Sequence, residues 1–289
     1  MRVADQWTEY EVLDCSDGEK LERFGGYVLR RPDPQVIWKT PKGREWRSPN
    51  AIYHRSSKGG GEWEFIDLPE EWSISYRDLT FRLKPFHFKH TGIFPEQAVN
   101  WDRMIDLISH AGREIRVLNL FAYTGGATLA CAYAGAKVTH VDAAKGMVAW
   151  AKENAEVSGL KDRPIRWLVD DCSRFVAREI RRGNTYDGIL LDPPSYGRGP
   201  KGEIWKLTDC LYALLQDTVQ LLSDDPLFFL LNSYTTGLAP SVLTYMLSDL
   251  LKKRGGTIVS TEIGLPVTAN GLILPCGASG WWTNGRDMV

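Results

Sequence analysis

The sequence has none of the long apolar runs that would place the protein in or across a membrane. No stretch reaches the roughly 18 uncharged apolar residues that a membrane-spanning helix requires, and residues 1–6 lack the apolar segment of a secretory signal. No charge of one sign dominates either, because 35 basic residues stand against 36 acidic ones. No global field therefore points to a nucleic acid or a membrane. We expect a cytoplasmic protein with no membrane contact, whose binding to any RNA is local.

Cysteine is also scarce, and its spacing forms neither close pairs nor a metal-ligand pattern. The five residues are Cys15, Cys131, Cys172, Cys210 and Cys276. An odd number without a paired framework predicts free thiols in a reducing compartment and no metal site. Most are expected to be small buried hydrophobic side chains. Cys276 is the exception, since it lies in a loop near an expected strand end, where a nucleophilic role stays open.

The sequence pattern of residues 1–88 predicts a β-rich accessory region that serves substrate recognition. Short aromatic segments alternate there with clusters of Pro, Gly and Ser. Expected strands cover 27–29, 36–38 and 63–66, with a loop tip at 58–61 and a hairpin over 72–83. A basic stretch with interleaved aromatics contains Lys39, Lys42, Arg44, Arg47, Arg55 and Lys58 among Trp38, Trp46 and Tyr53. It predicts either an RNA-contacting surface or a basic surface over core tryptophans.

Residues 89–289 have the sequence pattern of a catalytic α/β domain, in which apolar strand-like runs alternate with amphipathic helical stretches. This alternation predicts a doubly wound, Rossmann-like sheet of seven strands with helices on both faces. The expected strands are 116–120, 137–141, 165–169, 188–191, 227–231, 257–263 and a reversed last strand at 271–274. The expected helices are 96–111, 127–134, 145–157, 173–181, 204–222 and 240–253.

A glycine turn follows the first strand of this domain at Thr124, Gly125 and Gly126. Such a turn lets the backbone approach a ligand closely and presents a helix N-terminus to it. The dinucleotide fingerprint Gly-x-Gly-x-x-Gly is absent, because Phe121, Ala122 and Tyr123 occupy the positions before Thr124. This absence disfavours a nicotinamide dehydrogenase.

Acidic residues follow the next two strands. Asp142 ends the second strand, where its carboxylate can accept hydrogen bonds from both hydroxyls of a ribose, although it can also cap the next helix. Asp171, beside Cys172, follows the third strand and can accept from the amine of an adenine ring. Its neighbour Asp170 is expected to cap the helix.

The most specific motif is Asp192-Pro193-Pro194-Ser195-Tyr196 after the fourth strand. Two prolines make a rigid turn that aims the carboxylate and the adjacent carbonyls at one point, and the tyrosine can stack on a planar ring. This geometry suits a nucleobase. We therefore interpret Asp192, Pro193, Pro194 and Tyr196 as the catalytic group.

Taken together, these motifs resemble the class I S-adenosylmethionine-dependent methyltransferases, and most closely the bacterial 23S ribosomal RNA large-subunit methyltransferases. The resemblance covers about residues 89–233 and rests on 119–126, Asp142, Asp171 and 191–196. It implies S-adenosylmethionine as cofactor and RNA as substrate. The cofactor contacts that it implies are Phe121, Ala122, Tyr123, Thr124, Gly125, Gly126, Asp142, Asp171, Cys172, Asp192 and, from the segment 89–97, Gln97.

One departure from that family concerns the receiving atom. Members that methylate C5 of cytosine need a cysteine after the fourth or fifth strand, and this chain has Ser195 and Asn232-Ser233 there. We therefore expect transfer to an exocyclic nitrogen of an RNA base. A small-molecule methyltransferase and a catalytically silent RNA-binding protein stay open as alternatives, as does the oligomeric state.

Overall fold

The structure is a computed structural model that describes residues 1–56, 60–86, 88–198, 202 and 204–285. The chain forms two compact units, which we describe separately. Unit 1 comprises Met1–Val99 and Ile263–Cys276, and unit 2 comprises Asn100–Glu262 and Gly277–Val289. The predicted boundary at residue 88 stays a proposal. The first unit takes in a segment from near the C-terminus that the sequence did not assign to it.

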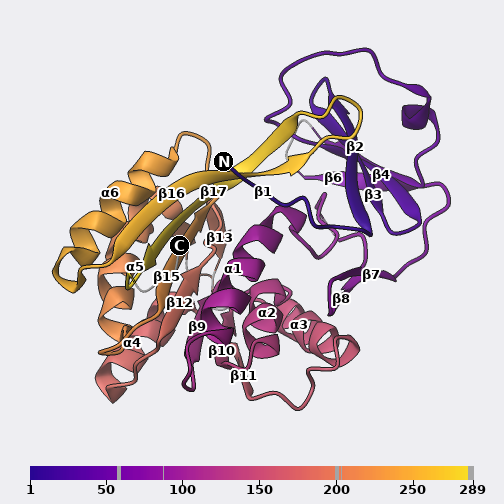
Figure 1. Ribbon diagram of the computed structural model, residues 1–289. Coiled ribbons are helices and arrows are strands. Elements are labelled where there is room, and N and C mark those ends of the chain that lie inside the picture. The colour runs from indigo at the N-terminus through magenta and orange to yellow at the C-terminus, as the bar shows by residue number, and fades with distance from the viewer. Residues whose placement is uncertain (57–59, 87, 199–201, 203, 286–289) are drawn as a thin grey trace. The chain divides into compact units, whose positions relative to one another are not determined.

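A largely parallel sheet forms the centre of unit 2 (Figure 1). Its strands lie in the order β1-β16-β17-β15-β12-β9-β10-β11. Their bounds are β1 Arg2–Val3, β9 Arg116–Leu120, β10 Lys137–Asp142, β11 Ile165–Val169, β12 Gly188–Leu191, β15 Phe228–Ser233, β16 Thr257–Pro266 and β17 Ile273–Thr283. All seven predicted strands are present, and the two-residue strand β1, which pairs with Ile263 and Gly264 of β16, adds an eighth at the edge of the sheet.

The strand order reverses between β9 and β12. Val117 of β9 pairs in parallel with Val138 of β10 on one side and with Gly188 of β12 on the other. The connections from these neighbouring strands therefore leave in opposite directions, and ligands of open α/β sheets bind at the carboxyl ends next to such a point. β17 alone runs antiparallel to its neighbour β15, with Phe228 opposite Thr283.

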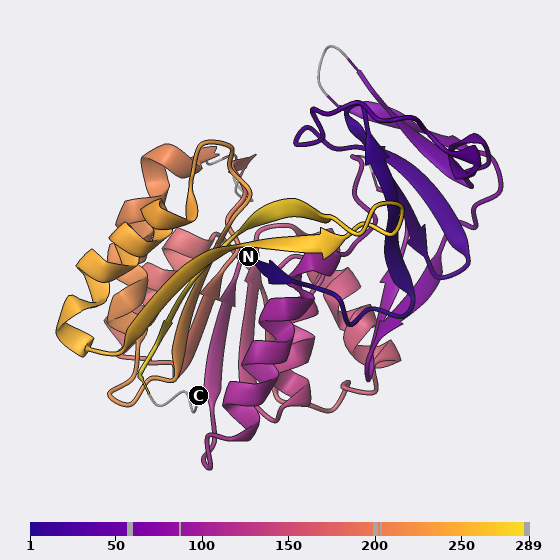
Figure 2. The ribbon, with the colours of Figure 1, turned by 45° about the horizontal axis from the view of Figure 1, so that its top comes forward.

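Six helices of the described residues flank this sheet. They are α1 Ala98–Ser109, α2 Gly126–Tyr133, α3 Lys145–Val157, α4 Cys172–Arg182, α5 Leu207–Thr218 and α6 Pro240–Leu251. Figure 2 shows α2 and α3 on one face of the sheet and α4, α5 and α6 on the other. No described helix is long and apolar enough to cross a membrane.

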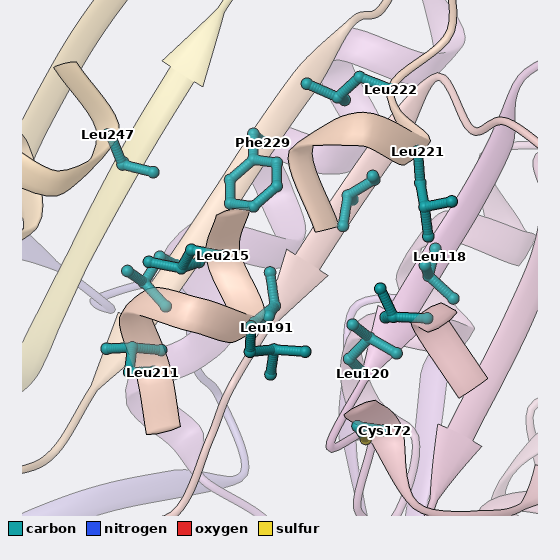
Figure 3. Close-up of a cluster of buried hydrophobic side chains, with 14 of the residues drawn as sticks. Leu118, Leu120, Cys172, Leu191, Leu211, Leu215, Leu221, Leu222, Phe229 and Leu247 are labelled. Carbon is teal, nitrogen blue, oxygen red and sulfur yellow. The ribbon is translucent and has the colours of Figure 1, made fainter. Parts of the chain in front are cut away.

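The core of unit 2 lies between the sheet and the second helix layer (Figure 3). Leu120 of β9, Leu191 of β12 and Phe229 of β15 are fully buried there, against Leu215 of α5 and Leu247 of α6. Each such side chain contributes about 1.5–3 kcal/mol when buried. The strand ends that carry the polar motifs are therefore anchored in rigid packing.

Unit 1 contains a five-stranded sheet and a separate hairpin. The sheet is formed by β2 Tyr10–Ser16, β3 Glu19–Phe24, β4 Tyr27–Pro32, β5 Ala51–Arg55 and β6 Gly61–Phe65, and the hairpin by β7 Trp72–Tyr76 and β8 Leu79–Leu83. Glu22 is buried beside Arg31, whose guanidinium lies 2.7 Å from its carboxylate. Burial alone would raise the pKa of Glu22, but the charges of Arg31 and Lys20 lower it to about 2.

Three secondary-structure predictions were wrong. Residues 36–38 form no strand, because they lie in an irregular segment with a single 3-10 turn, Arg44–Arg47. The helix predicted from residue 204 begins at Leu207, since β14 Ile204–Lys206 pairs with β13 Tyr196–Arg198. The last strand is β17, which extends nine residues beyond the predicted 271–274 and ends at Thr283. Residues 58 and 59 of the predicted loop tip lie outside the described residues.

Candidate functional site

The turn after β9 adopts an unusual backbone conformation. Phe121 and Tyr123 have positive φ angles of 56° and 50°, and Gly125 caps α2 with φ 88°. Positive φ in non-glycine residues costs about 1–3 kcal/mol and concentrates at ligand-binding positions. Gly126 must also be glycine, because a Cβ atom there would lie 2.6 Å from Cζ2 of Trp101 on α1.

Hydrogen bonds from neighbouring elements stabilise this turn. The backbone N–H of Ala122 donates to the carbonyl of Val141 at 3.1 Å. Asn154, fully buried on α3, donates from Nδ2 to the carbonyl of Thr124 at 2.9 Å. The sequence did not predict the role of Asn154, because its position in α3 shows no signal beyond helical periodicity.

Asp142 lies beside the turn at the end of β10. Its Oδ2 accepts from the backbone N–H of Tyr123 and its Oδ1 from that of Ala144, both at 2.8 Å. Burial raises the pKa of Asp142, while these two backbone donors lower it. A carboxylate offers about four acceptor positions, so both oxygens are held in place and still have lone pairs for ribose hydroxyls.

At the end of β11 the two acids have different partners. Asp171 is the N-cap of α4 and accepts from the backbone N–H of Arg174 at 2.9 Å, whereas Asp170 forms an ion pair with Arg178. The prediction that Asp170 caps the helix was therefore wrong. Cys172 is buried, burial raises the pKa of its thiol, and its Sγ accepts from the backbone N–H of Phe121 at 3.4 Å.

The Asp192-Pro193-Pro194 loop leaves the end of β12, adjacent to β9 in the sheet. The N–H of Asp192 donates to the carbonyl of Leu120 at 3.3 Å, which places the loop next to the turn after β9. Pro193 is buried, while Pro194 and Tyr196 are exposed. Tyr196 opens strand β13 and exposes 56% of its surface, so its ring is accessible to a partner.

Two side-chain contacts that the sequence did not indicate hold this loop. The indole N–H of Trp205 on β14 donates to the carbonyl of Pro194 at 2.7 Å. The hydroxyl of Ser195 lies 2.7 Å from that of Thr235, which follows β15. An isolated tryptophan and an isolated threonine follow no pattern that would mark them as partners of a loop ten or more residues away.

Several predicted residues belong to unit 1. Gln97 is buried in the 3-10 turn Pro95–Gln97, and its cofactor contact stays a proposal. Cys276 lies in the first part of β17, where burial raises the pKa of the thiol well above its ordinary value and disfavours a nucleophilic thiolate. In the basic stretch Trp46 and Tyr53 are buried, so the core interpretation holds for these two rings. Lys58 lies outside the described residues.

These residues of unit 2 fit the nucleoside part of S-adenosylmethionine. The anchored carboxylate of Asp142 suits its ribose, and Asp171 follows the adjacent strand at the position proposed for the adenine amine. The turn around Gly125 would approach the remaining part of the cofactor. Within the described ranges no three His, Cys, Asp or Glu side chains cluster as metal ligands would.

Comparison with known proteins places this geometry in a family. The crystal structure of an S-adenosylmethionine-dependent methyltransferase from Agrobacterium tumefaciens shares 36% sequence identity with this chain and superposes on it with a TM-score of 0.94. The match covers 98% of this chain and 93% of the Agrobacterium chain. Two curated relatives are named ribosomal RNA large subunit methyltransferase K/L. The one from Pseudoalteromonas atlantica is 31% identical over 57% of this chain, and the one from Shewanella baltica is 33% identical over 50%.

The match to these curated relatives is partial, since the chain spans only 23% and 20% of their lengths. A family model described as S-adenosylmethionine-dependent methyltransferase matches residues 30–230, well over half of the chain. This match includes the strand ends that carry Asp142, Asp171 and Asp192. The chain therefore belongs to the S-adenosylmethionine-dependent methyltransferase family.

Proposed function

We propose that this methyltransferase transfers the methyl group of S-adenosylmethionine to an exocyclic nitrogen of a nucleobase in ribosomal RNA. The observation that carries the proposal is the loop at Asp192, Pro193 and Pro194, which leaves β12 beside the turn of the cofactor site. A carboxylate and a proline carbonyl at this place are acceptors suited to an amino group. The adjacent Tyr196 is exposed and suited to stack on the base.

The reaction depends mainly on aligning the methyl donor with the acceptor nitrogen. S-adenosylmethionine would supply a methyl group that its sulfonium already activates. The amine nitrogen bonds to the methyl carbon as the bond from that carbon to sulfur breaks, S-adenosylhomocysteine leaves, and the nitrogen releases one proton to solvent. An exocyclic amine is a poor nucleophile while its lone pair is delocalised into the ring. Hydrogen bonds from the amine to the Asp192 carboxylate and the Pro193 carbonyl favour a more tetrahedral nitrogen, and holding it in line lowers the barrier. A target base in a duplex must first leave the stack, at a cost of about a few kcal/mol.

Transfer to C5 of cytosine lacks a nucleophile at the relevant strand ends. Asn232 and Ser233 end β15, and both are buried. Cys172 contacts the turn of residues 121–126, which we call the cofactor turn, but burial raises the pKa of its thiol well above the ordinary value. A thiol that resists ionisation is a poor nucleophile at neutral pH. This supports nitrogen as the receiving atom.

The ribosomal substrate is supported by the names of the curated relatives. Both are described as acting on ribosomal RNA of the large subunit, although this chain spans less than a quarter of either. Unit 1 is the candidate for substrate recognition. Within the basic stretch, Arg44 and Arg47 are exposed on its 3-10 turn and could contact phosphates.

The direct test replaces Asp192. We expect Asp192→Ala to reduce methyl transfer to RNA from cells lacking the gene by about 100-fold or more, with S-adenosylhomocysteine affinity largely unchanged. Asp217→Ala is the matched control, because Asp217 is an exposed acid on α5. Full activity of the Asp192 variant would refute its role. Cofactor binding without transfer by the wild type to any RNA would instead favour a small-molecule acceptor or a silent binding protein.

A further inference from the structure

Trp205 contacts both the loop of residues 192–196, which we call the acceptor loop, and the cofactor turn. Its indole N–H donates to the carbonyl of Pro194 at 2.7 Å. Its ring lies 5.0 Å from the ring of Phe121, at an interplanar angle of 52°. Both rings are partly buried and pack against the hydrophobic core of unit 2. We propose that Trp205 is a positioning residue that sets the distance and orientation between the methyl donor and the acceptor base.

Two prolines and two hydrogen bonds restrict the shape of the acceptor loop. Proline fixes its own φ angle, so Pro193 and Pro194 change shape mainly through their ψ angles, and Asp192, which precedes a proline, is restricted toward extended conformations. The bond from Trp205 fixes the carbonyl of Pro194, and the next carbonyl, that of Ser195, accepts from the N–H of Leu207 at 3.0 Å. With Pro194 held, the orientation of the Pro193 carbonyl and of Asp192 has little freedom left.

Trp205 also supports the left-handed conformation at the start of the cofactor turn. Phe121 is the first residue after β9 and has a φ of 56°, a left-handed conformation that surrounding contacts must maintain. The Trp205 ring is one such contact, and the bond from the Phe121 N–H to Cys172 Sγ is another. A shift of Trp205 would therefore move both sides of the reaction centre. Misplacement by about 1 Å can cost about 100-fold in rate.

This inference rests on the proposed function for its kinetic consequence, but its structural part can be tested without an acceptor. Trp205→Phe keeps a ring beside Phe121 and removes the N–H that holds Pro194. The matched control is Trp282→Phe, because Trp282 also donates to a backbone carbonyl, that of Gly255, at 2.7 Å. Trp282 lies opposite Phe229, near the start of β15. Thr235, which contacts the loop at Ser195, follows the other end of that strand, so Trp282 is distant along β15 from the loop.

Hydrogen exchange of the cofactor-bound protein tests the contact itself. We expect the backbone amides of residues 195–198 to exchange faster in Trp205→Phe than in the wild type and in Trp282→Phe, while α2 and α3 keep their protection. Unchanged exchange in residues 195–198 would overturn the proposal, whatever the acceptor is. This result does not depend on RNA as the substrate.

Single-turnover methyl transfer to RNA from cells lacking the gene tests the consequence. Trp205→Phe should lower the rate constant about tenfold, from the loss of about 1.4 kcal/mol of positioning, with little change in the KM for S-adenosylmethionine. Trp205→Ala also removes the contact with Phe121, so we expect a raised KM for the cofactor as well. A wild-type rate in Trp205→Phe, or an equal loss in Trp282→Phe, would contradict the positioning role. Absence of transfer in the wild type would count against the RNA substrate alone.

Discussion

Asp142 combines two properties that a ribose-binding carboxylate needs. Backbone donors at Tyr123 and Ala144 fix both of its oxygens, so little rotamer entropy is lost when a ligand binds. Burial lowers the local dielectric and strengthens each hydrogen bond to it. The same burial raises its pKa from the ordinary value of 3.8. Affinity for the cofactor should therefore depend on this one charge.

We predict that Asp142→Asn binds S-adenosylhomocysteine about 10- to 100-fold more weakly, because hydrogen bonds to a charged group contribute about 1.5–3 kcal/mol. Asp162→Asn, an exposed acid before β11, should bind normally. Titration calorimetry checks both. The wild-type affinity should also fall on acidification at a pH above the usual aspartate range, since a raised pKa means earlier protonation. Equal binding by the two variants would exclude Asp142 from the site.

His140 is a second residue whose protonation matters, here for stability. It is buried on β10 beside Thr128, whose hydroxyl lies 2.9 Å from Nδ1, and burial with the charge of Lys152 lowers its pKa to about 3. Below the unfolded value of about 6.5, the unfolded chain takes up a proton that the folded chain excludes. Stability due to the neutral ring is thus complete above pH 6.5 and falls as the pH drops toward 3.

Between pH 7.5 and 5, this single group should cost about 2 kcal/mol in the free energy of unfolding. Urea denaturation at both pH values measures the difference. His140→Gln removes the titration, so the difference between the two pH values should shrink by about 2 kcal/mol, even if the variant is less stable overall. His54→Gln is the control, because His54 is exposed on β5. An unchanged pH dependence in the His140 variant would refute the assignment.

Residue chemistry was more predictable from sequence than residue conformation. The acids at 142, 171 and 192 could be placed because they follow recognisable apolar strands. The left-handed conformations of Phe121 and Tyr123 could not, since sequence reasoning reserves positive φ for glycine. The capping role of Asp171 also depends on where α4 begins, which a sequence pattern leaves uncertain by a residue or two.

At the scale of elements, α2 depends on close packing against α1. Gly126→Ala would place a Cβ 2.6 Å from Cζ2 of Trp101. We expect a loss of about 1–3 kcal/mol from this overpacking. Gly146→Ala on α3 is the matched control, because a Cβ there meets nothing within 4 Å, and it should stabilise by up to about 1 kcal/mol. Thermal melts of both variants test the account, and a Gly126 variant as stable as the wild type would contradict it.

Elements with strong periodicity were predicted well, and those defined by long-range pairing were not. The helix expected over 145–157 is α3, and the strand expected over 188–191 is β12. β17 was truncated in the prediction because it contains Gly277 and Gly280, which disfavour strands. In the structure a Cβ at Gly280 would lie 3.0 Å from Cβ of Leu243 on α6, a tight contact that favours glycine there. β14 was missed because its partner is the short strand β13.

At the scale of the whole molecule, the division into units is discontinuous in sequence. Unit 1 includes residues 263–276, where Leu265 and Val267 are buried and the N–H of Thr268 donates to the carbonyl of Val12 at 2.9 Å. We predict that a fragment of residues 89–289 exposes this apolar segment and aggregates, whereas the full chain does not. Size-exclusion chromatography of both checks this, and a well-behaved fragment would support a boundary at residue 88.

The atom that receives the methyl group distinguishes the proposed reaction from its alternatives. Mass spectrometry of nucleosides from ribosomal RNA of cells with and without the gene tests it most directly. We predict that one nucleoside methylated on an exocyclic nitrogen disappears without the gene, returns with the wild-type gene and does not return with Asp192→Ala. Loss of 5-methylcytosine instead, or an unchanged set of nucleosides, would contradict the account.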